Sequence, residues 1–247
     1  MKLFQFSFLS LKHRLNKYAV LTCFICLSLT PVKVYCQEHQ AVLDTIYGAD
    51  PLLHNGKIYN FFPPFGTTGN PFLNGSEFVD GSLVLRGQTY QHLPLKYDIY
   101  NKVLVLGYLN ELGAQGQLVV SDAFLDAFTL GNMKFIPFRD VDSVIRYDQI
   151  IGDETFGIVY SWYKLIALDT RLGASNHVFS DPKKNAMLIR NQKLHSFKKK
   201  RSFLRLFTDS EREKVKTLIK KHKIKLHRAT DQQMELFVME CSKTLAQ

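Results

Sequence analysis

The segment LVLRGQTYQHLPLKYDIYNKVLVLGYL, residues 83–109, has the clearest local pattern in the chain. Apolar or aromatic side chains stand at every second position of its central part: Leu93, Leu95, Tyr97 and Ile99. A period of two places them on one face of a β-strand, whereas a helix would scatter them around its circumference. Gly87 and Asn101 interrupt the pattern on either side and mark tight turns. The segment therefore predicts three strands of an antiparallel meander.

A β body over residues 56–197 extends this meander. Alternation predicts further strands at 117–121, 123–130 and 133–138, and a hairpin over 186–197 that turns at Asn191. The strand predicted at 156–167, FGIVYSWYKLIA, is apolar on both faces and must be covered on both. Either helices pack over one face, or the sheet curls toward a partial barrel or a sandwich.

The curled alternative includes a binding site. If curling leaves an internal space, the aromatic and aliphatic side chains of this strand line a pocket for an apolar ligand: Phe156, Ile158, Tyr160 and Trp162. If side chains fill the interior, no pocket forms. The sequence leaves both outcomes open.

From residue 198 to residue 247 the pattern becomes helical. Four consecutive cations precede an apolar stripe, and the spacings Thr208-x-x-Glu211 and Thr230-x-x-Gln233 are typical of capping boxes that begin helices. Each amphipathic helix is expected to pack on the sheet. The predicted fold class is α+β, mainly antiparallel β, with a meander sheet or partial barrel or sandwich and C-terminal helices.

Residues 1–36 have the features of a secretory signal peptide. A basic leader precedes a mainly apolar run from Tyr18 to Leu29, which is too short to span a bilayer that needs about 20 residues. We predict cleavage near Cys36 and Gln37, export to the periplasm or to the outer membrane, and no transmembrane helix in the mature chain. An uncleaved anchor and an acylated Cys36 are less favoured. Residues 37–55 have little periodicity and are expected to form an extended lead-in.

The charge of the chain is divided between its two parts. Residues 37–182 carry nine basic and 16 acidic side chains, and residues 183–247 carry 18 basic and six acidic ones. A basic tail on an acidic body either docks on that body or meets an anionic lipid or glycan surface. The candidate contact residues are Lys198, Lys199, Lys200, Arg201, Lys220 and Lys221. Nucleic acid is disfavoured as a partner, because the protein is expected to be exported and this face has no interleaved aromatic platform.

Catalytic chemistry has no recognisable motif in this chain. The histidines lack zinc-site spacing, and no Gly-x-Ser-x-Gly elbow occurs. Cys241 is the single cysteine beyond residue 36 and lies on an apolar helical stripe, which favours a core residue over a reactive thiol. The sequence therefore assigns no catalytic, cofactor-binding or metal-binding residue, and an enzyme is the less favoured class.

Three segments carry a resemblance to a known family: GSLVLRGQTYQ (81–91), LPLKYDIYNKVLVL (93–106) and HSFKKKRSFLRLFTDSEREKVKTLIKKHKIKL (195–226). They resemble uncharacterised secreted proteins of Bacteroidota. The resemblance implies a signal peptide, a β-rich body and a lysine-rich helical tail, and it implies no activity. Asp-Thr-Ile at 44–46 and Asp-Ser-Val at 142–144 resemble O-glycosylation sites of exported Bacteroidota proteins, with Thr45 and Ser143 as acceptors.

These observations favour an exported protein of the cell envelope, acting as a non-enzymatic interaction or structural module. Its partner would be an envelope protein, a glycan or a lipid surface. Two alternatives stay open, a periplasmic carrier of a hydrophobic ligand and an envelope hydrolase. The sequence indicates no cofactor and does not decide the oligomeric state.

Overall fold

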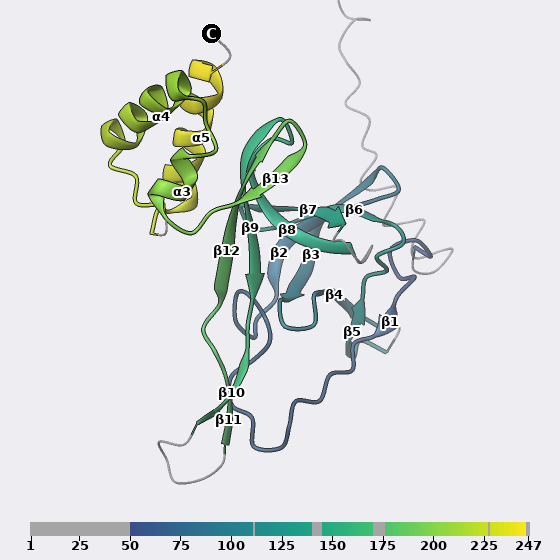
Figure 1. Cartoon of the computed structure of the whole chain (residues 1–247). Coiled ribbons are helices and arrows are strands. Elements are labelled where there is room, and N and C mark those ends of the chain that lie inside the picture. The colour runs from purple at the N-terminus through teal and green to yellow at the C-terminus, as the bar shows by residue number, and fades with distance from the viewer. Residues whose placement is uncertain (1–49, 111, 140–144, 170–175, 227, 246–247) are drawn as a thin grey trace, which may run out of the picture. The chain divides into compact units, whose positions relative to one another are not determined.

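An antiparallel sheet of 11 strands is the main element of the structure, a computed structural model that describes residues 50–247 except 111, 140–144, 170–175, 227 and 246–247 (Figure 1). Its strands are, in spatial order, β1 (Lys57–Ile58), β5 (Gln115–Val119), β4 (Val103–Leu109), β3 (Gln88–Asp98), β2 (Val79–Leu85), β6 (Leu125–Leu130), β7 (Met133–Arg139), β8 (Ile145–Gly152), β9 (Phe156–Tyr163), β12 (Lys183–Arg190) and β13 (Lys193–Ser196). The expected signal peptide, Thr45 and Ser143 lie outside the described residues.

The meander predicted from residues 83–109 is confirmed as β2, β3 and β4. Arg86 and Gly87 join β2 to β3 with φ angles of 49° and 79°, the two positive values that a tight primed turn requires. Residues 99–102 join β3 to β4 and include Asn101. Leu95, Tyr97 and Ile99 are buried, as their alternation predicted. The 186–197 hairpin is likewise confirmed, because Asn191 joins β12 to β13 in the same positive-φ conformation.

One face of the strands from β2 to β8 encloses a first hydrophobic core. Aromatic rings fill its centre: the rings of Phe128 and Phe135 stack with centroids 4.6 Å apart, and Tyr97 packs edge-on against both. The buried Tyr97 hydroxyl donates a hydrogen bond of 2.9 Å to the Tyr147 carbonyl oxygen. The curl of the sheet therefore covers this face with side chains of the sheet itself.

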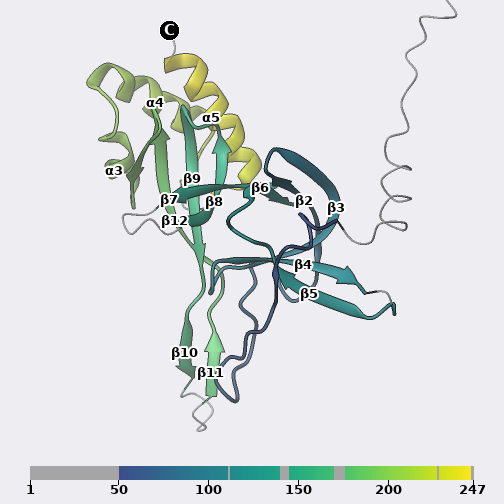
Figure 2. The ribbon, with the colours of Figure 1, turned by 90° about the vertical axis from the view of Figure 1, so that its right-hand side faces the viewer.

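Helices cover the next part of the same face. Helices α3 (Lys200–Leu204), α4 (Asp209–Lys221) and α5 (Asp231–Leu245) pack against β8, β9 and β12, where Ile151, Ile158 and Leu188 are buried (Figures 1 and 2). The opposite face of β9 contributes Val159 to a smaller cluster with Ile150 and Ile189. The helical layer covers one face of β9, and on the opposite face Val159 is buried while Tyr163 is only partly buried.

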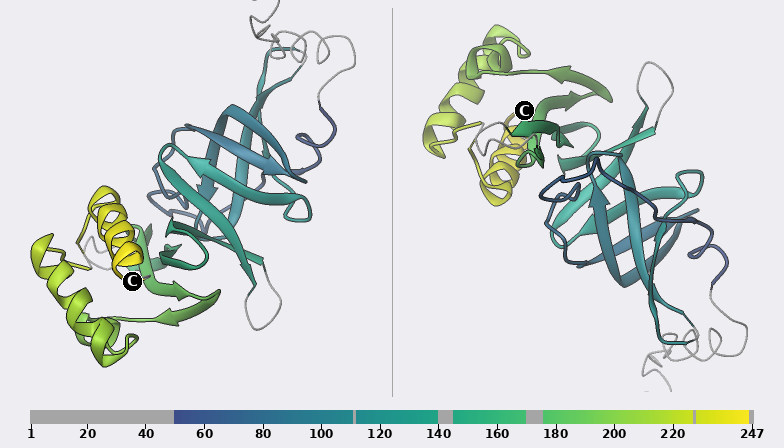
Figure 3. Two further views of the ribbon diagram at one scale, coloured as in Figure 1. Left: turned by 90° about the horizontal axis from the view of Figure 1, so that it is seen from above. Right: turned by 90° about the horizontal axis from the view of Figure 1, so that it is seen from below.

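The sheet is open. Its described strands end at β1 on one edge and at β13 on the other, so they do not close into a barrel. Figure 3 shows the helices gathered beside the β9 and β12 end of the sheet. The structure therefore combines a curled, open sheet with a helical layer at its β9 and β12 end.

The strand predicted at 156–167 is broken, which corrects the sequence-based prediction. Strand β9 ends at Tyr163, and β10 (Ile166–Asp169) pairs with β11 (Asn176–Phe179) in a separate two-stranded sheet. Between them, the Lys164 ammonium donates a hydrogen bond of 2.8 Å to the Asn70 carbonyl oxygen. The Leu165 amide donates to the Ser180 hydroxyl at 3.1 Å. These contacts with other segments take the chain out of the main sheet.

Candidate functional site

Helices α3 and α4 border an open, shallow cleft of about 590 Å³ with a cationic lining. Its side chains are those of Lys200, Arg201, Leu204, Arg205 and Arg212. Four of the five are basic, and Leu204 is the apolar member. We call this surface the cationic cleft.

Two aromatic residues fix α3 so that its basic side chains face outward. Phe203 and Phe207 are buried, with ring centroids 5.2 Å apart, and Phe203 also packs edge-on against Phe197 at 4.8 Å. Helical spacing then leaves Lys200 and Arg201 exposed. The apolar residues that hold α3 in the core therefore determine where its cations lie.

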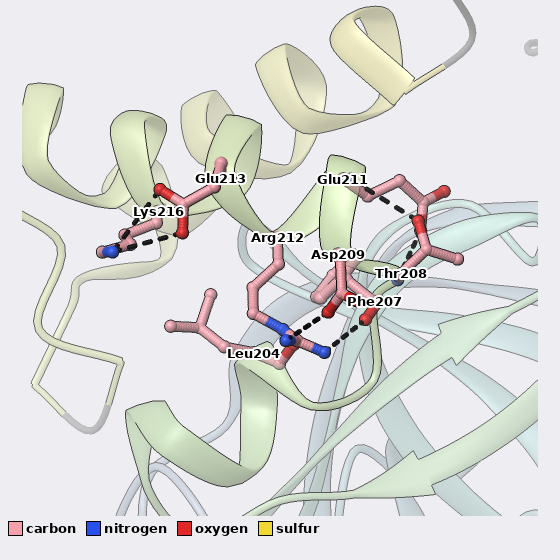
Figure 4. Close-up of polar contacts among 8 residues, drawn as sticks. All are labelled: Leu204, Phe207, Thr208, Asp209, Glu211, Arg212, Glu213 and Lys216. Atoms are coloured by element: carbon pink, nitrogen blue, oxygen red, sulfur yellow. Dashed lines mark hydrogen bonds and ion pairs between the residues drawn. The ribbon is translucent and has the colours of Figure 1, made fainter.

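Helix α4 begins with the capping box that the sequence predicted. The Thr208 amide donates to the Glu211 carboxylate at 3.0 Å, and the Glu211 amide donates to the Thr208 hydroxyl at 3.5 Å (Figure 4). These two bonds satisfy backbone donors that the first turn of a helix leaves free. They fix the position of Arg212, the next residue of the helix.

Arg212 joins the two helices at the cleft. Its guanidinium donates to the carbonyl oxygens of Leu204 at 3.0 Å and Phe207 at 3.1 Å, and to the Asp209 carboxylate at 2.6 Å (Figure 4). The Leu204 carbonyl group, which ends α3, thereby accepts from a cation, and a cation also suits the negative end of the helix dipole. Arg212 thus acts as a positioning residue that holds one wall of the cleft.

The other cations of the cleft lack a counter-charge in the described part of the chain. The three carboxylates in the first half of α4 are engaged elsewhere: Asp209 with Arg212, Glu211 with Arg190, and Glu213 with Lys216. The side chains of Lys200, Arg201 and Arg205 make no hydrogen bond or ion pair with a described residue. Three positive charges therefore face solvent around Leu204.

Glu211 also fastens α4 to the sheet. Arg190, the last residue of β12, donates to one Glu211 carboxylate oxygen at 3.0 Å and pairs with the other as well. The hydrogen bond from Arg190 is the main reason that the pKa of Glu211 falls from 4.5 to about 2, and the amide and hydroxyl of Thr208 add to the effect. The ion pair thus links the helix that carries Arg212 to β12, the strand next to the β13 edge of the sheet.

The structure brings together only part of the predicted basic set. Lys200 and Arg201 lie in the cationic cleft, whereas Lys198 and Lys199 are exposed before α3 begins. Lys220 and Lys221 lie eight or nine residues beyond Arg212 on α4, or about 12 Å along its axis. Lys221 also pairs with Glu240 at 2.9 Å. The six predicted cations therefore do not form one surface.

Sequence reasoning missed Arg205 and Arg212 as members of the site. Arg201 and Arg205 are four residues apart, a spacing that places two side chains on one side of a helix, and this signal could have found Arg205. Arg212 had no such signal, because its role depends on the angle between two helices.

The predicted apolar lining is mostly covered by the helical layer. Phe156 and Ile158 are buried among side chains of the helices, and the rings of Phe156 and Phe207 lie 6.4 Å apart. Tyr160 lines a second, smaller cleft together with Lys184 and Lys198. Trp162 is half-buried and contacts both large hydrophobic clusters.

Comparison with protein-family models, curated proteins and solved structures finds no match to this chain. No helix within the described ranges is long and apolar enough to cross a membrane. The same residues contain no group of three or more His, Cys, Asp or Glu side chains that could hold a metal ion.

Proposed function

We propose that this chain is an exported, non-enzymatic interaction module that binds an anionic lipid surface of the cell envelope through the cationic cleft. The observation that supports the proposal most directly is the uncompensated charge of Lys200, Arg201 and Arg205 around Leu204. Anionic headgroups attract such cations at about 1 kcal/mol each, and an apolar side chain among them suits the boundary with acyl chains. The resemblance to secreted Bacteroidota proteins and the expected signal peptide are consistent with this compartment.

The test compares two triple variants that remove the same charge. The chain from Gln37 onward is sedimented at low salt with vesicles of phosphatidylglycerol and phosphatidylcholine, and with phosphatidylcholine alone. The cleft variant carries Gln at its three uncompensated cations: Lys200, Arg201 and Arg205. The control carries Gln at three exposed lysines outside the cleft: Lys214, Lys220 and Lys225.

We expect the cleft variant to bind anionic vesicles about 100-fold more weakly, because three contacts of about 1 kcal/mol are lost. The control should stay within about threefold of the parent protein, and 0.5 M salt should weaken parental binding. Equal losses in both variants would show that net charge, and not the cleft, causes binding. Equal binding of the parent to both kinds of vesicle would refute the proposal.

A further inference from the structure

A second cleft, of about 230 Å³, lies between β12 and the segment that precedes α3. Its polar lining comes from Tyr160, Lys184, Asn185 and Lys198, and its apolar lining from Ala186, Phe197 and Leu226. Tyr160 and Ala186 are directly opposite each other in the pairing of β9 with β12, and Lys184 is opposite Trp162. These four side chains therefore share the face of the sheet on which the helices pack.

The polar groups of this cleft lack partners in the described chain. Tyr160 is 1% exposed, and its hydroxyl has no hydrogen-bond partner among the described residues. Buried hydroxyl groups are nearly always hydrogen-bonded, because a buried polar group without a partner is unfavourable. The Lys184 ammonium makes no ion pair or hydrogen bond with any residue that the structure describes, and it lies over the Tyr160 and Trp162 rings, at 3.6 Å and 4.9 Å from their centroids.

The nearest acidic group is engaged elsewhere. The Trp162 indole donates to the Gln149 side-chain oxygen at 2.8 Å, and the Gln149 side-chain nitrogen donates to the Asp231 carboxylate at 2.6 Å. These two hydrogen bonds hold the carboxylate of Asp231, the first residue of α5, against Gln149, and Asp231 forms no ion pair with Lys184. The cleft therefore offers two cations and a free hydroxyl beside three apolar side chains.

We infer that this cleft binds a small monocarboxylate with an apolar body. The carboxylate would accept a hydrogen bond from the Tyr160 hydroxyl and pair with the ammonium groups of Lys184 and Lys198. The apolar body would contact Phe197 and Leu226. The volume of the cleft equals that of about eight water molecules in the liquid, which suits an acid of six to nine non-hydrogen atoms. The inference is independent of the cationic cleft.

Trp162 provides the assay, because it is the single tryptophan of the sequence and lies beside Lys184. Hexanoate is titrated into the chain from Gln37 onward while tryptophan fluorescence emission is followed. Hexanamide, which has the same apolar body without the charge, and inorganic phosphate, which has charge without the apolar body, are the controls. Saturable binding of hexanoate, at least tenfold tighter than that of either control, is expected. Equal binding of hexanamide or phosphate, or no binding of hexanoate, overturns the inference.

Substitutions then separate ligand binding from folding. Tyr160→Phe should weaken hexanoate binding about tenfold, because a hydrogen bond to a charged group is lost, while leaving the ligand-free protein as stable as the parent or more stable. Lys184→Met should weaken binding at least tenfold, and Lys183→Met, at an exposed neighbouring position, should change it less than twofold. A less stable ligand-free Tyr160→Phe protein would show that the hydroxyl already has a partner and would overturn the inference, as would unchanged affinity in that variant.

Discussion

The ion pair between Arg190 and Glu211 predicts a pH-dependent contribution to stability. In the folded protein the pKa of Glu211 is lowered from 4.5 to about 2, chiefly by the hydrogen bond from Arg190. A carboxyl group with a lowered pKa stabilises the folded state when it is ionised. Its contribution is therefore complete above the unfolded pKa of 4.5, and it is lost as the pH falls from about 4.5 to about 2.

The magnitude follows from the size of the shift. A shift of about 2.5 pH units corresponds to about 3.4 kcal/mol at 1.36 kcal/mol per unit. The two side chains are 29% and 19% exposed, so water screens part of this energy. We therefore expect a contribution of about 1–2 kcal/mol to the free energy of unfolding at pH 7.

Glu211→Gln is the appropriate perturbation, because glutamine can keep the capping box with Thr208 while it removes the charge. Urea unfolding followed by circular dichroism should give a free energy of unfolding lower by about 1–2 kcal/mol at pH 7. The difference from the parent should shrink toward zero near pH 2. Glu213→Gln is the matched control, since its partner Lys216 is 50% exposed, and it should cost less than about 0.5 kcal/mol.

Two results would refute this reasoning. A difference between parent and Glu211→Gln that stays the same at pH 7 and pH 2 would mean that charge is not its source. A double-mutant cycle with Arg190→Met that gives no coupling energy at pH 7 would mean that the two side chains do not stabilise each other.

Two further predictions concern the sheet and the last helix. Gly81→Ala should lower the free energy of unfolding by at least about 2 kcal/mol, because the added Cβ would lie 2.2 Å from the Thr129 carbonyl oxygen. Thermal unfolding followed by circular dichroism measures the effect, and a melting temperature within 2 °C of the parent would contradict this prediction. Cys241 should resist Ellman's reagent in the folded chain from Gln37 onward and react fully in urea, because burial excludes the reagent and raises the thiol pKa to about 12. Rapid labelling of the folded protein would contradict this expectation.

Much of the fold could be predicted because its determinants are local. Alternation at Leu95 and Tyr97 depends on strand geometry alone, and the capping box at Thr208 depends on four consecutive residues. The buried stripe of α5, with Met234 and Phe237, likewise follows from helical spacing.

The remaining features depend on contacts between distant segments. Nothing near Tyr163 in sequence shows that β9 ends there, because the cause is the bond from Lys164 to Asn70. Strand β9 pairs with β12, although β10 and β11 lie between them in the sequence and form a separate sheet, and no local sequence pattern predicts this pairing. The two clefts were missed for the same reason, since they form where segments meet after folding.

The position of the helices at the end of the sequence has a consequence for synthesis. Strands β6 to β9 pair in chain order, so the sheet can grow as the polypeptide emerges, but the apolar surface around Ile158 and Leu188 stays uncovered until the last helix is complete. A chain that stops before residue 200 would carry this surface into solution, where such patches promote aggregation. Helices α3 to α5 are therefore needed to cover that surface, although they are synthesised after the strands that form it.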